Sequence, residues 1–272
     1  MSVETIARHD GAGAASLLAA AFADASPVSL SELEARAELL ERQDQKYLLP
    51  QASAAQLVAQ LRPSFDALDI DGQRTFTYDS VYLDTPDLAL YREHAQGRRL
   101  RWKVRTRRYG DGPLCFQEVK LKAARGATIK LRRRCAVSEH GWAGPDLLAF
   151  VDSALREHYG ERLRHRLVPS LSIDYARSTL VASGGGERLT FDRALRIVDS
   201  RGRRTGGLRK DLVLLEVKTG AGRSEVHRLL AARGVRPLSV SKYGVGVALT
   251  HGHVGHNRLR PVLHAGFESA AA

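Results

Sequence analysis

The 272-residue chain is poor in features that define several common classes of protein. Its two cysteines, Cys115 and Cys135, form no CxxC pair, so a zinc site is not expected. The sequence does not exclude a disulfide between them, but we expect both to be reduced thiols in the core, which suits a cytoplasmic protein. No apolar run reaches the roughly 18 residues that a membrane helix needs. The Ala-rich stretch 11–25 is preceded by one arginine, Arg8, so no signal peptide is expected.

Acidic residues are scarce relative to basic ones. The chain has 42 Lys and Arg against 30 Asp and Glu, a net charge of +12. Such a surplus favours an anionic partner, namely nucleic acid, a membrane surface or a phosphorylated small molecule. Because arginine-rich bacterial proteomes share this surplus, the bulk charge does not choose among the three.

Alternating apolar residues predict a chain dominated by strands joined by short turns. Strands are expected at 45–50, 74–84, 99–109, 114–122, 127–137, 168–181, 187–199 and 211–219. Helices are expected at 30–42, 52–61, 144–159 and 224–234, and residues 239–249 are expected to form a last strand or a loop. This order favours an α+β fold, with an antiparallel sheet or barrel of about eight strands and appended helices.

The stretch LRWKVRTRRYG at residues 100–110 has a basic residue at every second position. Side chains of a strand alternate between its two faces, so four cations would share one face about 7 Å apart. The other face is mostly apolar and includes Trp102 and Val104. The four cations are Arg101, Lys103, Arg105 and Arg107.

The same alternation places cations on one face of at least four strands. A solvated sheet face explains any single strand of this kind and is the commoner case. Exposed faces usually mix charges of both signs, however, whereas the face of residues 101–107 carries no acid of its own. The repetition therefore favours a closed barrel whose lumen holds an anion such as a phosphate chain.

Three carboxylates, Glu118, Asp192 and Glu216, fall on these basic faces. They are either salt-bridge partners of the cations or ligands of Mg²⁺ or Mn²⁺, hard ions that take oxygen ligands and bridge to phosphates. Nucleic acid is not expected, because the basic faces lack interleaved aromatic residues for base stacking. Only Trp102 and Tyr109 flank the basic strand, and Trp102 lies on its other face.

Nine segments occur in the order of a known family. They are RQDQKYLL (42–49), SVYLDTPD (80–87), KVRTRRYG (103–110), FQEVKLK (116–122), IKLRR (129–133), SIDYAR (172–177), RLTFD (188–192), LLEVK (214–218) and SVSKYGVG (239–246). Together they resemble the VTC domain, the polyphosphate polymerase module of the vacuolar transporter chaperone complex. That domain belongs to the triphosphate tunnel metalloenzymes.

The resemblance implies an antiparallel β-barrel tunnel that binds ATP, triphosphate or polyphosphate with Mn²⁺ or Mg²⁺. It implies transfer of the ATP γ-phosphate onto a growing polyphosphate chain, with Glu216 as the main metal ligand. Glu118 and Asp192 are further metal candidates from the strand alternation alone. The catalytic phosphate ligands that it implies are Lys46, Arg105, Arg107, Lys120, Lys130, Arg177, Lys218 and Lys242. Further substrate-binding candidates are Arg101, Lys103 and Arg132, which rest on the alternation alone, and Arg188 and Ser241.

The sequence departs from the family pattern at two places. Asp44-Gln45-Lys46 stands where tunnel enzymes commonly carry Glu-x-Lys, and Ser239 stands where the polymerase pattern has a second lysine, with Arg236 nearby. Hydrolysis of a triphosphate and non-catalytic sensing of polyphosphate or nucleotide are therefore the alternative functions.

The resemblance covers about residues 36–250. Residues 1–35 are expected to be a flexible Ala/Ser-rich segment, and residues 251–272 a loose tail. Export of a product would need a separate membrane partner, and the sequence defines no oligomeric state.

Overall fold

Alternating β-branched, aromatic and charged residues build the main feature of the fold, a large and mostly antiparallel sheet of twelve strands. The computed structural model describes all residues except 1–10, 37–42, 123–127, 221, 223 and 272. The chain forms two units, of which the first comprises residues 1–75, 177–193 and 208–239. The second comprises residues 76–176, 194–207 and 240–272.

In the first unit the strand order is β2-β11-β9-β8-β3-β1. The strands are β1 (Pro27–Val28), β2 (Gln43–Pro50), β3 (Phe65–Leu68), β8 (Val168–Ala182), β9 (Glu187–Asp199) and β11 (Leu212–Thr219), and β8 and β9 continue into the second unit. The helices are α1 (Gly11–Ala23), α2 (Leu30–Arg36), α3 (Gln51–Leu61) and α6 (Glu225–Ala232).

One face of this part of the sheet is apolar and forms the core of the first unit. Tyr47, Val217 and Phe191 lie on three adjacent strands and are each at most 2% exposed. They pack with apolar residues of α1, α3 and α6, such as Leu57 and Leu230. The alternation that buries these residues leaves the charged residues of the same strands on the opposite face.

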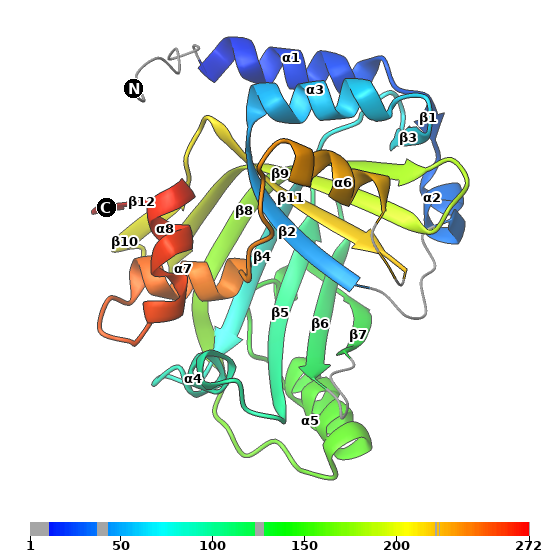
Figure 1. Ribbon diagram of the computed structural model, residues 1–272. Coiled ribbons are helices and arrows are strands. Elements are labelled where there is room, and N and C mark those ends of the chain that lie inside the picture. The colour runs from blue at the N-terminus through cyan, green and yellow to red at the C-terminus, as the bar shows by residue number, and fades with distance from the viewer. Residues whose placement is uncertain (1–10, 37–42, 123–127, 221, 223, 272) are drawn as a thin grey trace. The chain divides into compact units, whose positions relative to one another are not determined.

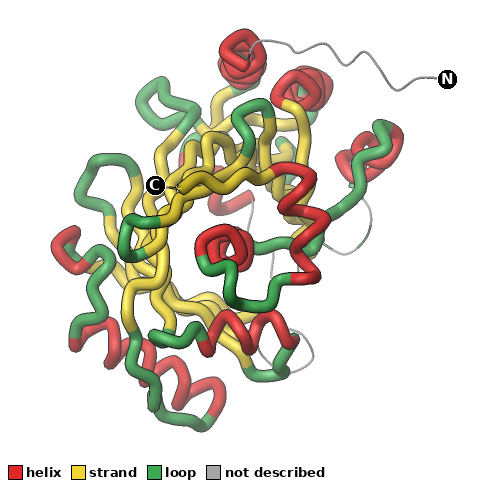
Figure 2. Tube along the Cα trace, turned by 90° about the vertical axis from the view of Figure 1, so that its left-hand side faces the viewer, coloured by secondary structure: helices red, strands yellow, loops and turns green. Residues whose placement is uncertain are grey.

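The N-terminal segment, for which the composition predicts flexibility, contains the helix α1. Leu18 and Phe22 of α1 are 2% exposed, and the ring of Phe22 meets Phe191 edge-on at 5.3 Å. The helix lies beside α3, as both views show (Figures 1 and 2). The small alanine side chains let α1 pack closely against α3. Burial of its apolar residues therefore stabilises a helix that composition alone does not predict. Residues 1–10 of the predicted flexible segment and residues 37–42 of the helix predicted at 30–42 lie outside the described residues.

In the second unit the strand order is β12-β10-β9-β8-β4-β5-β6-β7. The further strands are β4 (Phe76–Asp84), β5 (Arg101–Tyr109), β6 (Cys115–Lys122), β7 (Thr128–Cys135), β10 (Arg204–Leu208) and β12 (Phe267–Ala271). The helices are α4 (Ala89–Gln96), α5 (Pro145–Tyr159), α7 (Lys242–Thr250) and α8 (Arg260–Gly266), with short 3₁₀ turns η2 (Val137–Glu139) and η3 (Asn257–Leu259).

Helix α5 covers the apolar face of β5 and β6 (Figure 1). Trp102, Val104 and Val119 are at most 5% exposed and pack against Leu147 and Val151 of the helix. The alternation predicted for residues 100–110 is therefore confirmed on its apolar side. Within the described residues, no helix combines the length and hydrophobicity needed to cross a membrane.

Residues 242–250, predicted as a strand or a loop, form α7, so that prediction is wrong. Ser241 is its N-cap and its Oγ accepts a hydrogen bond of 3.0 Å from the backbone N–H of Gly244. A Cβ on Gly246 would lie 2.9 Å from Leu171, so the helix packs there only because the residue is glycine. The alternation of glycine and valine in residues 244–247 is typical of a strand. The N-cap at Ser241 and the close packing at Gly246 stabilise a helix instead.

The predicted loose tail also contains regular structure, namely η3, α8 and β12. Val262 and Phe267 are 6% and 9% exposed, so burial of apolar residues fixes this segment. The sheet has more strands than the expected eight because β10, β12 and the short β1 and β3 are added to the predicted set.

A Phe22→Ala substitution tests whether α1 belongs to the folded unit. We expect a loss of about 3–5 kcal/mol in the free energy of unfolding, because a buried ring is replaced by a cavity. Leu17→Ala on the same helix is the control, since Leu17 is 56% exposed and its truncation should cost under about 0.5 kcal/mol. Urea denaturation followed by circular dichroism measures both, and equal effects would contradict the packing of α1.

Candidate functional site

Strands β5, β6 and β7 present a strongly basic surface, here called the cationic face. The register pairs Lys103 with Lys120 and Lys120 with Lys130, so three lysines stand directly opposite one another on adjacent strands. Like charges in such positions repel. The basic residues of the face are Arg101, Lys103, Arg105, Arg107, Lys120, Lys122, Lys130, Arg132 and Arg134.

Glu118 is the one carboxylate that these three strands place on the cationic face. It is 3% exposed, and its Oε2 accepts a hydrogen bond of 2.6 Å from Arg105 Nε while Lys130 Nζ lies 2.7 Å from its Oε1. Burial raises the pKa of Glu118, but Arg105, Arg107 and Lys130 outweigh it and hold that pKa far below the usual value. Glu118 therefore remains an anion that positions Arg105 and Lys130.

Aromatic side chains lie among the cations, contrary to the prediction that the basic faces lack them. Arg105 Nη1 donates to Tyr82 Oη at 2.7 Å, and its guanidinium lies 5.5 Å from that ring. The guanidinium of Arg132 lies 3.4 Å from the centroid of the Phe116 ring. Tyr82 reaches Arg105 from a neighbouring strand through the register, which a single-strand pattern does not show, whereas the alternation of residues 116–122 already places Phe116 on the same face as Lys120. The basic faces therefore do contain aromatic residues, and each of these rings contacts a cation.

Two titratable groups respond to the concentrated positive charge. Burial raises the pKa of Tyr82, but Arg105, Arg107 and Lys242 bring it below its ordinary value. Burial, followed by the charges of Lys103 and Arg101, lowers the pKa of His94 to about 3. His94 is thus neutral at physiological pH, and both shifts have the sign that a positive electrostatic potential requires.

The N-terminus of α7 brings Ser241 and Lys242 to the residues of the cationic face. Lys103 Nζ lies 3.3 Å from Ser241 Oγ, and Lys242 Nζ lies 4.9 Å from the ring centroid of Tyr175. Ser241, named from the sequence as a substrate-binding candidate, is also the N-cap of α7. Tyr243 donates a short hydrogen bond to Asp84 Oδ2, which anchors this end of the helix.

Asp84 is a buried carboxylate that the sequence analysis did not single out. It is 0% exposed, its Oδ1 accepts from the backbone N–H groups of Thr85 and Leu90, and its Oδ2 accepts from Tyr91. These bonds tie β4 to α4, and the bond from Tyr243 adds α7. The signal in the sequence is the Asp-Thr-Pro-Asp turn, in which an aspartate after a strand binds backbone N–H groups.

In the first unit, β2, β11, β9 and β8 carry a second charged surface, here called the mixed-charge face. Glu216 is paired in register with Lys46, and Lys218 is paired with Asp44 on one side and Arg188 on the other. Lys218 Nζ lies 2.5 Å from Glu216 Oε1 and 3.3 Å from Asp44 Oδ2. Lys46 Nζ lies 3.8 Å from Glu216 Oε1.

Arg177 and Asp192 form a buried bidentate pair on this face. Arg177 Nε and Nη2 donate to the two oxygens of Asp192 at 2.6 and 2.8 Å, and Asp192 is 0% exposed. A fork of two parallel hydrogen bonds fixes the plane of the guanidinium. Asp192 thus positions Arg177, as Glu118 positions Arg105.

The carboxylates differ in how well they suit a divalent cation. Within the described part of the chain, no group of three or more His, Cys, Asp or Glu gathers that could hold a metal ion. Asp192 and Glu118 are buried and engaged by guanidinium groups. Glu216 and Asp44 share Lys218, and two carboxylates suffice for Mg²⁺ or Mn²⁺ when phosphate oxygens and water supply the other ligands. The donor set of Glu216 and Asp44 fits such an ion.

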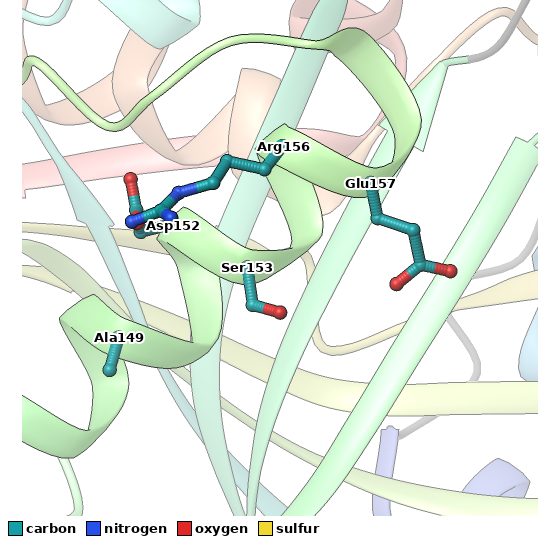
Figure 3. Close-up of a pocket in the computed structure, with 5 residues that line it drawn as sticks. All are labelled: Ala149, Asp152, Ser153, Arg156 and Glu157. Atoms are coloured by element: carbon teal, nitrogen blue, oxygen red, sulfur yellow. The ribbon is translucent and has the colours of Figure 1, made fainter.

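Figure 3 shows a surface hollow on α5 that none of the predicted site residues lines. Its lining includes Asp152 and Arg156, which form an ion pair one helical turn apart, and Ser153 and Glu157. Helical pairs of this kind are ordinary surface features. The hollow therefore adds nothing to the two charged faces.

The comparison with protein families identifies the chain. Residues 41–251 match the VTC domain, so the chain belongs to the VTC domain family, as the nine ordered segments predict. Members of this class handle triphosphate or polyphosphate ligands, which agrees with the concentration of Lys and Arg on two sheet faces. No curated protein sequence matches the chain.

Solved structures show distant similarity. A candidate adenylyl cyclase from Hippeastrum, reported to have a dominant triphosphatase activity, is 18% identical with a TM-score of 0.48, covering 77% of this chain and 96% of that one. A candidate adenylate cyclase from Bacillus halodurans is 12% identical with a TM-score of 0.45, covering 75% and 96%. The protein PH1819 from Pyrococcus horikoshii is 11% identical with a TM-score of 0.42, covering 76% and 98%.

The buried pair on the mixed-charge face yields a stability prediction. Arg177→Ala removes the guanidinium from a fully buried carboxylate, and we expect it to lower the free energy of unfolding by about 3–5 kcal/mol. The matched control is Arg209→Ala, which breaks the exposed pair with Asp211 and should cost under about 1 kcal/mol. Urea denaturation compares them, and a loss for Arg177→Ala no larger than that of the control would contradict the assignment of Arg177 and Asp192 as a structural pair.

Proposed function

We propose that the protein is a metal-dependent phosphotransferase that moves the ATP γ-phosphate onto a growing polyphosphate chain. The catalytic and binding roles of the residues named above, the closed barrel tunnel and the extent of the domain over residues 36–250 are part of this proposal. Membership of the VTC domain family supports it. So does the construction of both charged faces, in which buried carboxylates position arginines.

The observation that carries the proposal is the cationic face itself. Nine basic side chains share it with one carboxylate, and lysines stand opposite lysines across two strand boundaries. A solvated face would relieve this repulsion with acids at opposing positions. A phosphate chain relieves it better, because each of its oxygens accepts charge-assisted hydrogen bonds and arginine offers two parallel donors.

The chemistry needs little covalent work from the protein. Lys and Arg side chains stabilise the charge that spreads over the transferred phosphoryl oxygens, and they hold the two reacting ends in line. Glu216 and Asp44 would hold Mn²⁺ or Mg²⁺, which would neutralise part of the negative charge of the phosphate groups. Arg105, positioned by Glu118 and Tyr82, is suited to a transferring phosphoryl group because its orientation is fixed before the ligand arrives.

A second candidate is hydrolysis of a triphosphate at the same residues. It is favoured by Ser239, which stands where the polymerase pattern has a second lysine. With one cation fewer for the acceptor chain, water becomes the competing nucleophile. The two functions share the phosphate donor and the metal, and they differ only in the acceptor.

Incubation with ATP and Mn²⁺, assayed for released phosphate and for chains longer than pyrophosphate, tests the function. We expect long chains from the wild type and a loss of about 100-fold or more in rate for Glu216→Gln and for Arg105→Ala. Arg133→Ala is the control: Arg133 lies on the opposite face of β7, where it bonds Gln117 and the backbone of Asp146.

The product decides between the candidates. Phosphate release without chains, abolished by the same two substitutions, would establish a triphosphatase. Tight tripolyphosphate binding without either product would establish a sensor. Loss of activity in Arg133→Ala equal to that in Arg105→Ala, with both proteins folded, would contradict the assignment of the cationic face.

The pH dependence of binding provides a separate prediction for Lys130. Burial, together with the charges of Arg105 and Arg107, outweighs the attraction of Glu118 and lowers the pKa of Lys130 to about 8. Because the protonated form attracts phosphate, the contribution of Lys130 to tripolyphosphate affinity should be complete below that pKa and be lost as the pH rises through it. Lys130→Arg should remove this fall, since arginine stays charged. Calorimetric titration across the pH range measures both, and identical profiles would show that Lys130 does not contact the ligand.

A further inference from the structure

The second unit contains a basic cavity that shares no residue with the two charged faces. It has a volume of about 650 Å³ and lies among the starts of α4 and β8, the turn between β9 and β10, and the end of α7. Its walls include Pro86, Pro169 and Ser170. The basic side chains in its lining are Arg166, Arg201, Arg203, Arg204, His251 and His253.

The four arginines of the cavity lack carboxylate partners. In the residues that the structure describes, none of their guanidinium groups forms an ion pair with Asp or Glu. One acid, Asp199, lines the cavity, and its Oδ1 accepts backbone hydrogen bonds from Arg203 and Arg204 at 2.7 and 3.2 Å. Asp199 therefore stabilises the turn and does not pair with the arginine side chains.

The turn that carries three of these arginines is held in place. Gly202 N donates to Asp199 O at 2.9 Å, and Ser200 N donates to Ser170 O at 2.9 Å. Gly202 has a φ of 67°, which glycine adopts without strain. Arg204 Nη1 donates to Thr250 O at 3.4 Å, which ties the turn to the end of α7. The arginines are thus presented by a fixed turn.

His251 has a defined tautomer. Thr250 Oγ1 donates its single proton to Gly246 O at 2.8 Å, so the 2.8 Å contact between Thr250 Oγ1 and His251 Nδ1 requires that Nδ1 carries the proton. The titrating nitrogen is therefore Nε2. Burial, with His253, Arg204 and Arg201, lowers the pKa of His251 against the opposing effect of Asp199.

From these contacts we infer a second anion site, in which the cavity binds a phosphate group through Arg166, Arg201 and Arg203 with His251 beside them. Free orthophosphate and the end of a phosphate chain present the same chemistry, a tetrahedral dianion whose oxygens accept bonds from guanidinium groups. A solvated patch explains the exposed arginines one by one. It does not explain why a concave cavity collects four of them, three on a fixed turn, while the one acid in its lining is bonded to the backbone.

The inferred site does not depend on the proposed function. Helix α7 has Lys242 at its first residue and Thr250 at its last, eight residues and about 12 Å apart. Ligands at its two ends would thus contact different residues, so binding in the cavity can be followed separately from events at the cationic face.

The experiment measures the pKa of His251 by NMR in the full chain, with its resonance assigned from the spectrum of His251→Gln. Orthophosphate and tripolyphosphate are compared with chloride at matched ionic strength. A bound dianion favours the protonated imidazole, so both phosphates should raise the pKa by about one unit over chloride. A response to tripolyphosphate alone would also support the site and would identify the chain end as its ligand.

Substitutions test the contacts. Arg201→Ala and Arg203→Ala should each weaken binding about tenfold. Arg228→Ala, which removes an exposed arginine of α6 that does not line the cavity, should leave the phosphate-induced rise in the pKa of His251 unchanged. Equal responses to phosphate and chloride, or a pKa rise that survives both cavity substitutions, would overturn the inference.

Discussion

Electrostatic repulsion between lysines and arginines on adjacent strands is the constraint on which the rest of the second unit depends. Antiparallel pairing sets side chains about 5 Å apart across a strand boundary, so Lys103, Lys120 and Lys130 cannot avoid one another by moving along the sheet. The opposite face keeps the strands together. Trp102, Val104 and Val119 are buried against α5, and slipping the register by one residue would exchange them with the cations. The hydrophobic core thus maintains an electrostatically unfavourable face.

On both charged faces a buried carboxylate fixes the orientation of an arginine side chain. A nearly inaccessible carboxylate, Glu118 in one unit and Asp192 in the other, binds one guanidinium. Such a pair contributes little net stability, because desolvation offsets the attraction. What it contributes is orientation, since a planar guanidinium held at two atoms cannot rotate. The free-energy cost of burying these carboxylates is better explained by the orientation that they give to Arg105 and Arg177 than by a gain in the stability of the fold.

The strands of the charged faces could be predicted from the sequence. The alternation within each strand indicates which of its residues lie on the same face. It could not show which residues lie opposite each other on neighbouring strands. The contact of Tyr82 with Arg105 and that of Phe116 with Arg132 were therefore missed, although each ring lies in a predicted strand. The helix α7 was missed because its glycines and valines alternate, and only the close approach of Leu171 to Gly246 shows why glycine is there. The basic cavity combines four short segments far apart in the chain, so no local pattern predicts it.

The tyrosines bear on what the cationic face can recognise. Tyr78 stacks on Tyr175 with centroids 5.1 Å apart, and Tyr82 stacks on Tyr243 at 4.9 Å. These rings also contact Arg107, Arg105 and the lysines Lys242 and Lys103. A ring face occupied by another ring or by a cation is not open to a nucleobase, so the aromatic residues orient cations and do not form a stacking platform. Under the proposed function, recognition at this face rests on phosphate charge, and a triphosphate without a base should bind there as well as a nucleotide does.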